Sequence, residues 1–232
     1  MYLVHASLAL LLALSAIDVN NQVTPLGFQM SSFPLDPPQS RALLESSKYS
    51  STGPLTSILA LLSTSGKVLQ ETLDKDVAKE ARLKFRHRSG DHMTLLNVLR
   101  AYEEVLGQDT PLANDDSVSA ADASMDVVVT SKKTGPSNKS SRKAVKEWCK
   151  ANYLNERSLK EALEIRKQLR TCCDRAKLEW NILSTNKEGD EMEEGILRSL
   201  LMGLWQNTAL IQPDGTYRQA IGREVRVSSP LP

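Results

Sequence analysis

The sequence is poor in the residues that most often build disulfide, metal and cofactor sites. Its 232 residues include only three cysteines and three histidines. Cys149, Cys172 and Cys173 show no C-x-x-C or Cys/His ligand spacing, which predicts reduced thiols, no disulfide framework and no metal site. The formal net charge is only +1, so no overall electrostatic field selects nucleic acid or membrane.

The motifs of common catalytic sites are also missing. The sequence contains no GxxxxGKS/T phosphate loop, no GxGxxG fingerprint, no HExxH metal motif and no nucleophile elbow. Ser89, Asp91 and His92 lie close together in sequence, but their side chains would diverge around a helix start and form no catalytic triad. We therefore predict no catalytic residue, and the residues favour a helical binding or scaffolding module.

An apolar run near the N-terminus, residues 8–14, has the length of a signal-peptide core. However, no Lys or Arg precedes it, and it is too short to span a bilayer. We interpret it as a core helix of an intracellular protein, nuclear or cytoplasmic, without a membrane partner. A secreted protein with a mature chain starting near Ile17 is the alternative, because the run resembles a signal peptide.

Two helix starts organise the middle of the chain. The first lies at Gly90, Asp91 and His92, where Gly90 lets the chain turn and the Asp91 carboxylate can cap the first turn. At the second, Asn155 caps a helix whose apolar stripe is interrupted by Arg166. An Arg at such a position reaches solvent, pairs with an acid or meets an anionic ligand, because a buried unpaired charge is too costly.

Positive charge is concentrated around the second helix. Residues 142–179 contain eleven Lys and Arg against six Asp and Glu. The usual cause of such an excess is a solvated helix face, and the alternative is a surface that contacts phosphates.

Composition also divides the chain into segments. Turns and short helices in residues 1–63 are compatible with a winged-helix-like unit. Residues 107–141, rich in Asp, Ser and Thr and then in Lys, predict a disordered surface insertion. The turn Pro213-Asp214-Gly215 predicts a β-hairpin, followed by a short strand near Val225. We expect this β segment to be truncated, because a three-stranded sheet could not close before residue 232.

Several sequence phrases match a known family in order and spacing. They are Leu26-Gly27 with Met30, Phe33-Pro34-Leu35 and Pro37; Ser89-Gly90-Asp91-His92 with Leu95-Leu96-Asn97; Trp148-Cys149 with Asn152 and Asn155-Glu156-Arg157-Ser158-Leu159; Ile165-Arg166 with Gln168-Leu169; and Pro213-Asp214-Gly215-Thr216-Tyr217. Together they resemble the C-terminal region of DEAH-box ATP-dependent RNA helicases over nearly the whole chain.

The resemblance implies a mainly α fold with three parts. These are a partial winged-helix-like unit (1–63), a helical-bundle ratchet or helicase-associated domain (64–182, with the insertion 107–141) and the truncated start of an antiparallel OB-like domain (183–232). In this family, preceding RecA-like domains carry the phosphate loop and the DEAH box and bind ATP and Mg²⁺. We therefore expect this chain to bind no cofactor and to be inactive alone. Its implied partners are RNA, the RecA-like domains and protein cofactors.

In the family, the ratchet domain lines the RNA channel. Our hypothesis is that Arg157 and Arg166, with Asn155 and the helix start at His92, contact the RNA backbone, since guanidinium groups and helix N-termini both suit phosphate. The alternative is that Asn155 is only a cap and Gly90-Asp91 only a turn. The competing function is a non-catalytic protein-interaction module, or a truncated regulator that binds a helicase partner through exposed apolar surface.

Overall fold

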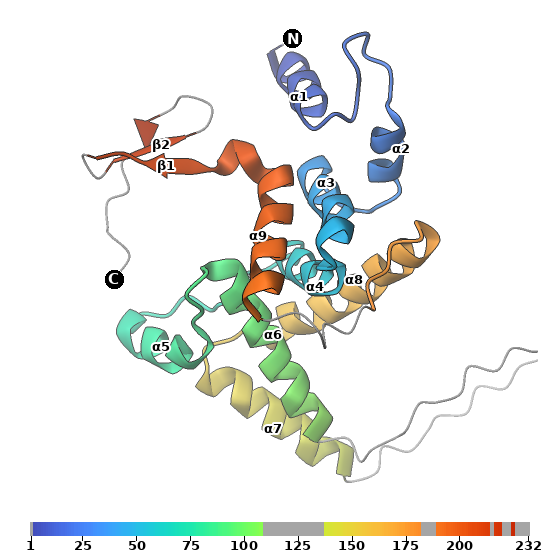
Figure 1. The fold of residues 1–232 in the computed structure, drawn as a ribbon. Coiled ribbons are helices and arrows are strands. Elements are labelled where there is room, and N and C mark those ends of the chain that lie inside the picture. The colour runs from blue at the N-terminus through green and yellow to red at the C-terminus, as the bar shows by residue number, and fades with distance from the viewer. Residues whose placement is uncertain (1, 109–136, 182–188, 214–215, 220–223, 226–232) are drawn as a thin grey trace, which may run out of the picture. The chain divides into compact units, whose positions relative to one another are not determined.

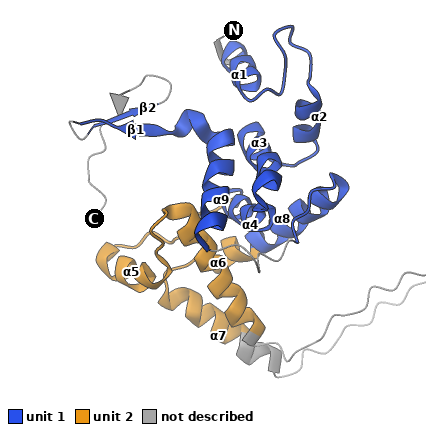
Figure 2. Ribbon diagram, in the orientation of Figure 1, with its two compact units in different colours: residues 1–64, 161–232 blue, residues 65–160 orange. Residues whose placement is uncertain are grey.

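The computed structural model describes residues 2–108, 137–181, 189–213, 216–219 and 224–225. The described residues are mainly helical with one small antiparallel sheet, which confirms the predicted fold class (Figure 1). Spatial contacts divide the chain into unit 1, residues 1–64 with 161–232, and unit 2, residues 65–160 (Figure 2). The predicted domain boundaries stay predictions, because the two units follow contacts rather than chain order.

The helices and strands divide between the units. Unit 1 contains α1 (Tyr2–Ala13), α2 (Pro25–Ser31), α3 (Pro37–Ser46), the short 3-10 helix η1 (Ser47–Tyr49), α4 (Thr52–Leu62), most of α8 (Glu156–Arg175), α9 (Gly189–Leu204), η3 (Trp205–Asn207), β1 (Ala209–Ile211), β2 (Tyr217–Gln219) and β3 (Glu224–Val225). Unit 2 contains α5 (Lys75–Arg82), η2 (Leu83–Phe85), α6 (Asp91–Gln108), α7 (Ser137–Ala151) and the start of α8.

Helix α3 lies at the centre of unit 1 and packs against α2, α4 and α9 (Figure 1). Leu43 of α3, Ile58 and Leu59 of α4 and Ile196 of α9 are completely buried. Helix α4 is rich in apolar residues and buries residues on most of its sides. Each large apolar side chain buried in this core contributes roughly 1.5–3 kcal/mol.

Helix α9 approaches α3 through small residues. Gly195, Ser199 and Gly203 recur every four residues along α9, and all three are buried. A Cβ atom at Gly203 would lie 2.0 Å from the backbone oxygen of Pro38. The Ser199 hydroxyl lies 3.4 Å from the Ser51 hydroxyl, and a Cβ atom at Gly195 would lie 2.9 Å from the Tyr49 Cβ atom, so these two small residues face the segment that follows α3. The close approach of the two helices therefore depends on the absence of a side chain at position 203.

Thr24 caps helix α2. The Thr24 hydroxyl accepts a hydrogen bond from the Gly27 N–H at 3.0 Å, and Pro25 occupies the first helical position. Both features favour helix initiation, since the cap satisfies a free N–H and proline has none to satisfy.

The N-terminal apolar run forms a helix, but the prediction that it is a core helix is wrong. Val4, Leu8 and Leu12 of α1 are exposed, and burial begins only at Leu14. Apolar sequence predicts burial only where another element covers it, and exposed apolar residues are common on protein surfaces. Within the described ranges, no helix combines the length and the hydropathy that a bilayer-spanning segment needs.

The C-terminal β segment is an antiparallel sheet in the order β1-β2-β3. Leu210 of β1 faces Arg218 of β2, and Tyr217 of β2 faces Val225 of β3. The predicted hairpin is thus confirmed, although Asp214 and Gly215 of its turn lie outside the described residues. The assignment of this segment to an OB-like domain stays a prediction.

Aromatic residues form the core of unit 2. The Phe85 and Trp148 rings meet edge to face at 5.9 Å between centroids, and the Tyr102 ring lies 6.2 Å from Trp148. The Tyr102 hydroxyl is buried without a hydrogen-bond partner among the described residues, and burial raises its pKa. Packing of this cluster therefore depends on shape and apolar area rather than on the hydroxyl.

The predicted insertion, residues 107–141, lies mostly outside the described residues. At its edges, however, α6 continues to Gln108 and α7 begins at Ser137, so both flanking helices extend into the predicted segment. Helix α7 begins among polar residues at Ser137 and continues to Ala151. Its Val145 and Cys149 side chains are buried in unit 2.

Unit 2 should lose stability at alkaline pH through Cys149. Burial raises the pKa of its thiol to about 11, from an ordinary value of 9.0. The stabilising contribution is complete below about pH 9 and is lost as the pH rises towards 11, because only the unfolded thiol ionises in that interval. We expect a loss of up to about 3 kcal/mol, at 1.36 kcal/mol per pH unit over two units. Urea unfolding at several pH values should show a shallower pH dependence for Cys149→Ala, and equal slopes would contradict the assignment.

Candidate nucleic-acid interface

The connection from α7 to α8 is a tightly capped turn. The Asn155 Oδ1 atom accepts hydrogen bonds from the backbone N–H groups of Arg157, at 3.1 Å, and Ser158, at 3.4 Å. Its carbonyl accepts the first helical bond, from the Leu159 N–H at 3.0 Å. The prediction that Asn155 caps this helix is confirmed. Its side-chain oxygen is therefore engaged by the helix itself.

An extended segment, residues 67–70, supports this turn from within unit 2. The Asn155 N–H donates to the Val68 carbonyl at 2.8 Å, and the Gln70 N–H donates to the Tyr153 carbonyl at 2.9 Å. A β-bridge between Leu69 and Leu154 lies between these two bonds. The turn thus has the backbone pairing of a short strand, which fixes where α8 begins.

Arg82 joins the two backbone segments. Its Nη2 atom donates to the Gln70 carbonyl at 2.6 Å and to the Tyr153 carbonyl at 2.7 Å. Tyr153 has a positive φ of 54°, a backbone conformation that needs support from its surroundings. Burial lowers the pKa of Arg82, and its Nε atom has no hydrogen-bond partner among the described residues. Arg82 acts here as a structural brace rather than as a surface charge.

The cations near the braced turn differ in whether a neighbouring carboxylate pairs with them. Lys160 pairs with Glu156, and Lys67 pairs with Glu71. Arg157 is exposed, and its side chain forms no ion pair within the described ranges. The braced turn therefore presents one uncompensated guanidinium to solvent.

Arg166 has a different environment in unit 1. Its side chain is half-buried, and Nη1 donates to the buried Ser57 hydroxyl at 3.4 Å. Arg157 and Arg166 are nine residues apart on α8, about 2.5 turns, so their side chains leave the helix on opposite sides. One phosphate cannot meet both of them.

At the helix start predicted around Asp91, the observed start of α6 is shifted by one residue. Gly90, with φ of 103°, precedes the helix, and its carbonyl accepts the Thr94 N–H at 3.1 Å. Asp91, predicted as the cap, is instead the first helical residue, where its carboxylate still lies near the positive end of the helix dipole. The reason is that only glycine takes this positive φ readily. His92 is half-buried in the same turn.

Comparison with known proteins shows what this chain is similar to. The winged-helix model of the helicase-associated domain (HA2) matches residues 7–35, from α1 through α2. The ATP-dependent RNA helicase DHX33 of Mus musculus is 31% identical over 212 residues, which cover 91% of this chain and 24% of that protein. The chain resembles the C-terminal region of a DEAH-box RNA helicase.

Two further relatives agree. The ATP-dependent RNA helicase DHX33 of Homo sapiens is 30% identical over 91% of this chain, and that of Drosophila melanogaster is 30% identical over 90%. The chain spans about a quarter, 24%, of the length of these helicases. The predicted resemblance to DEAH-box RNA helicases is confirmed by these matches.

Sequence reasoning missed the residues that support the module. No local sequence pattern distinguishes Arg82 from neighbouring cations. A second residue that was missed is Trp180, whose side chain contacts Arg170 and Asp174. The sequence held a signal for these contacts, because Arg170 and Asp174 share one face of α8 and the tryptophan follows soon after the helix ends. Within the described residues, no group of three or more His, Cys, Asp or Glu could hold a metal ion.

Proposed function

We propose that this chain binds single-stranded RNA as the helicase-associated module of a DEAH-box helicase. The observation that carries the proposal is the exposed, uncompensated Arg157 on a turn braced by backbone pairing. A guanidinium on such a turn suits a phosphate, because it can donate two parallel hydrogen bonds. The relatives are named as RNA helicases, which supports RNA as the ligand.

In this proposal the ATP-driven chemistry belongs to RecA-like domains. They would bind ATP and Mg²⁺, since this sequence has no phosphate loop and no DEAH box. The module would hold RNA while those domains move it, and the RecA-like domains and further protein cofactors would be its partners. His92 and Asn155 are assigned supporting roles at the helix starts, since the Asn155 oxygen is already engaged as a cap.

RNA affinity against salt concentration tests the phosphate contact. For Arg157→Gln in the full chain, the slope of log K against log salt should become shallower by about 0.7, the value for one phosphate contact on a single strand. Arg166→Gln should have a smaller effect, because that side chain is bonded to Ser57. The matched control is Lys160→Gln on the same helix, where Glu156 already compensates the charge. An unchanged slope for Arg157→Gln contradicts the contact.

A second candidate is a protein-interaction module. Leu197, Leu201 and Met202 of α9 are exposed, and so are Leu210 and Ile211 of β1. Exposed apolar groups of this kind mark association surfaces. This function predicts concentration-dependent self-association in the absence of RNA, measurable by sedimentation velocity, with no salt-dependent RNA binding.

A further inference from the structure

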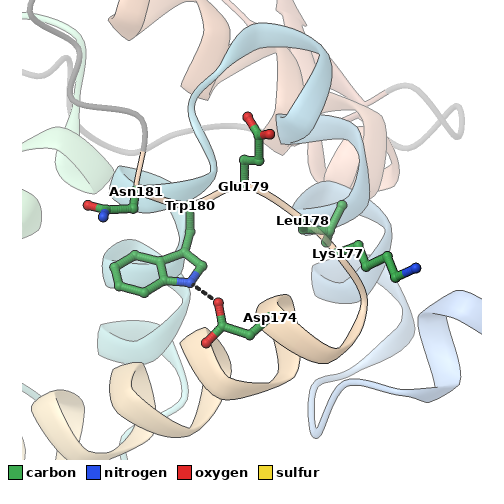
Figure 3. A pocket seen from close by; sticks show the side chains of 6 residues that line it. All are labelled: Asp174, Lys177, Leu178, Glu179, Trp180 and Asn181. Atoms are coloured by element: carbon green, nitrogen blue, oxygen red, sulfur yellow. Dashed lines mark hydrogen bonds between the residues drawn. The ribbon is translucent and has the colours of Figure 1, made fainter. Parts of the chain in front are cut away.

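A tryptophan in unit 1 is held by two polar neighbours from α8. The Trp180 indole N–H donates to the Asp174 carboxylate at 2.6 Å (Figure 3). The Arg170 guanidinium lies over the ring, 4.5 Å from its centroid, as a cation–π contact. The hydrogen bond fixes the rotation of the indole, and the guanidinium covers one of its faces. The Trp180 residue as a whole is half-buried. Such a fixed ring is a preorganised stacking surface.

The loop that carries the ring is also held in place. The Trp180 backbone oxygen packs where Gly53 has no side chain, since a Cβ atom at Gly53 would lie 2.5 Å from it. The loop and the N-terminal end of α4 therefore fit closely within unit 1.

A hollow of about 560 Å³ opens beside this ring. It is lined by Asp174, Lys177, Leu178, Glu179, Trp180 and Asn181. Figure 3 shows Trp180 and Asn181 on one side and Lys177 and Leu178 on the other. Lys177 stands at the far rim, and its ammonium group is directed away from Trp180. A nucleotide could stack its flat base on the ring while this long, flexible side chain turns toward the phosphate.

Lys177 occupies a backbone position where glycine is usual. Helix α8 ends with the Leu178 N–H donating to the Cys173 carbonyl at 2.9 Å, and Lys177 has φ of 55°. At this left-handed position a glycine avoids the strain that a Cβ atom creates. Strained residues of this kind are concentrated at binding sites, where the strain is part of the arrangement.

We propose that the hollow formed by residues 174–181 binds one nucleotide unit of single-stranded RNA. The base stacks on Trp180, and the phosphate pairs with Lys177. Glu179 would repel a phosphate, so the phosphate lies on the Lys177 side, while Asn181 can donate and accept hydrogen bonds at the base edge. This inference rests on the proposed RNA binding and adds a base-contacting site to the phosphate contact at Arg157.

The test measures binding of a fluorescein-labelled oligouridylate to the full chain by anisotropy. Trp180→Leu should weaken binding about tenfold, the size expected for one stacked base. Lys177→Gly should weaken it about threefold and make the salt slope shallower by about 0.7. The same glycine should raise the melting temperature, because it relieves the left-handed strain. Weaker binding by a more stable variant cannot be attributed to unfolding.

Trp205→Leu, at a half-buried tryptophan outside the hollow, is the matched control and should bind as the parent does. The oligonucleotide should also quench tryptophan emission in the parent but not in Trp180→Leu. This inference is overturned if Trp180→Leu and Lys177→Gly bind RNA as tightly as the parent does. The proposed function is then still decided by the salt dependence of Arg157→Gln. Saturable quenching by uridine monophosphate alone, without oligonucleotide binding, overturns the RNA assignment in favour of a free nucleotide. Absence of any RNA binding by the parent overturns both proposals.

Discussion

Gly203→Ala should destabilise the protein by about 2 kcal/mol, although alanine is the better helix former. The new Cβ atom would lie 2.0 Å from the Pro38 oxygen and 3.0 Å from the Ala42 Cβ atom. Backbone atoms cannot move aside as a flexible side chain can, so α9 must shift away from α3. Overpacking of this kind costs about 3 kcal/mol, against a gain of about 1 kcal/mol in helix propensity.

Urea unfolding followed by circular dichroism measures this change. The control is Gly107→Ala near the end of α6, where no atom lies within 4 Å of the new Cβ position. That substitution should stabilise slightly, by up to about 1 kcal/mol. If both alanine variants were equally stable, the close packing of α9 on α3 would be incorrect.

Replacing Arg82 with Met should cost about 2 kcal/mol and should also weaken RNA binding. Methionine retains much of the apolar stem but removes the donor that joins the Gln70 and Tyr153 carbonyls at 2.6 and 2.7 Å. Hydrogen bonds from charged groups contribute about 1.5–3 kcal/mol, and the exposed Gln70 carbonyl can recover part of this from water. Without the brace, the positive-φ residue Tyr153 loses support, and Arg157 is held less rigidly.

The experiment compares unfolding and RNA affinity in Arg82→Met, Arg82→Lys and a control. The lysine variant should fall between the parent and Arg82→Met, because it keeps a charged donor but not the planar guanidinium. Arg100→Met, at an exposed position on α6, should change stability by no more than about 0.5 kcal/mol. Parent-like stability in Arg82→Met would show that residues 67–70 hold the turn without it.

Features that depend on neighbouring residues were predicted well. Asn155 caps its helix as expected, because a cap joins a side chain to backbone groups two or three residues away. The cap predicted at Asp91 was wrong by one residue. Gly90 precedes the helix and Asp91 is its first residue, because the φ of 103° at position 90 suits glycine. The family resemblance likewise came from local phrases and is confirmed by the relatives.

The packing of distant segments could not be predicted in this way. The apolar run of α1 indicated a helix, but its sequence did not show that Val4, Leu8 and Leu12 would remain exposed. Likewise, Arg82 and Gly203 look like ordinary helix residues until their distant contacts are known.

The sequence by itself determined the helical class, the Asn155 cap, the hairpin and the family resemblance, since periodicity, capping and turn chemistry act within a few residues. Only the tertiary structure decided which cations are available. Arg166 is bonded to Ser57, which is 109 residues away in the sequence, whereas Arg157 extends into solvent. The free energy of a charge depends on what surrounds it in space, and residues far apart in the chain supply those surroundings.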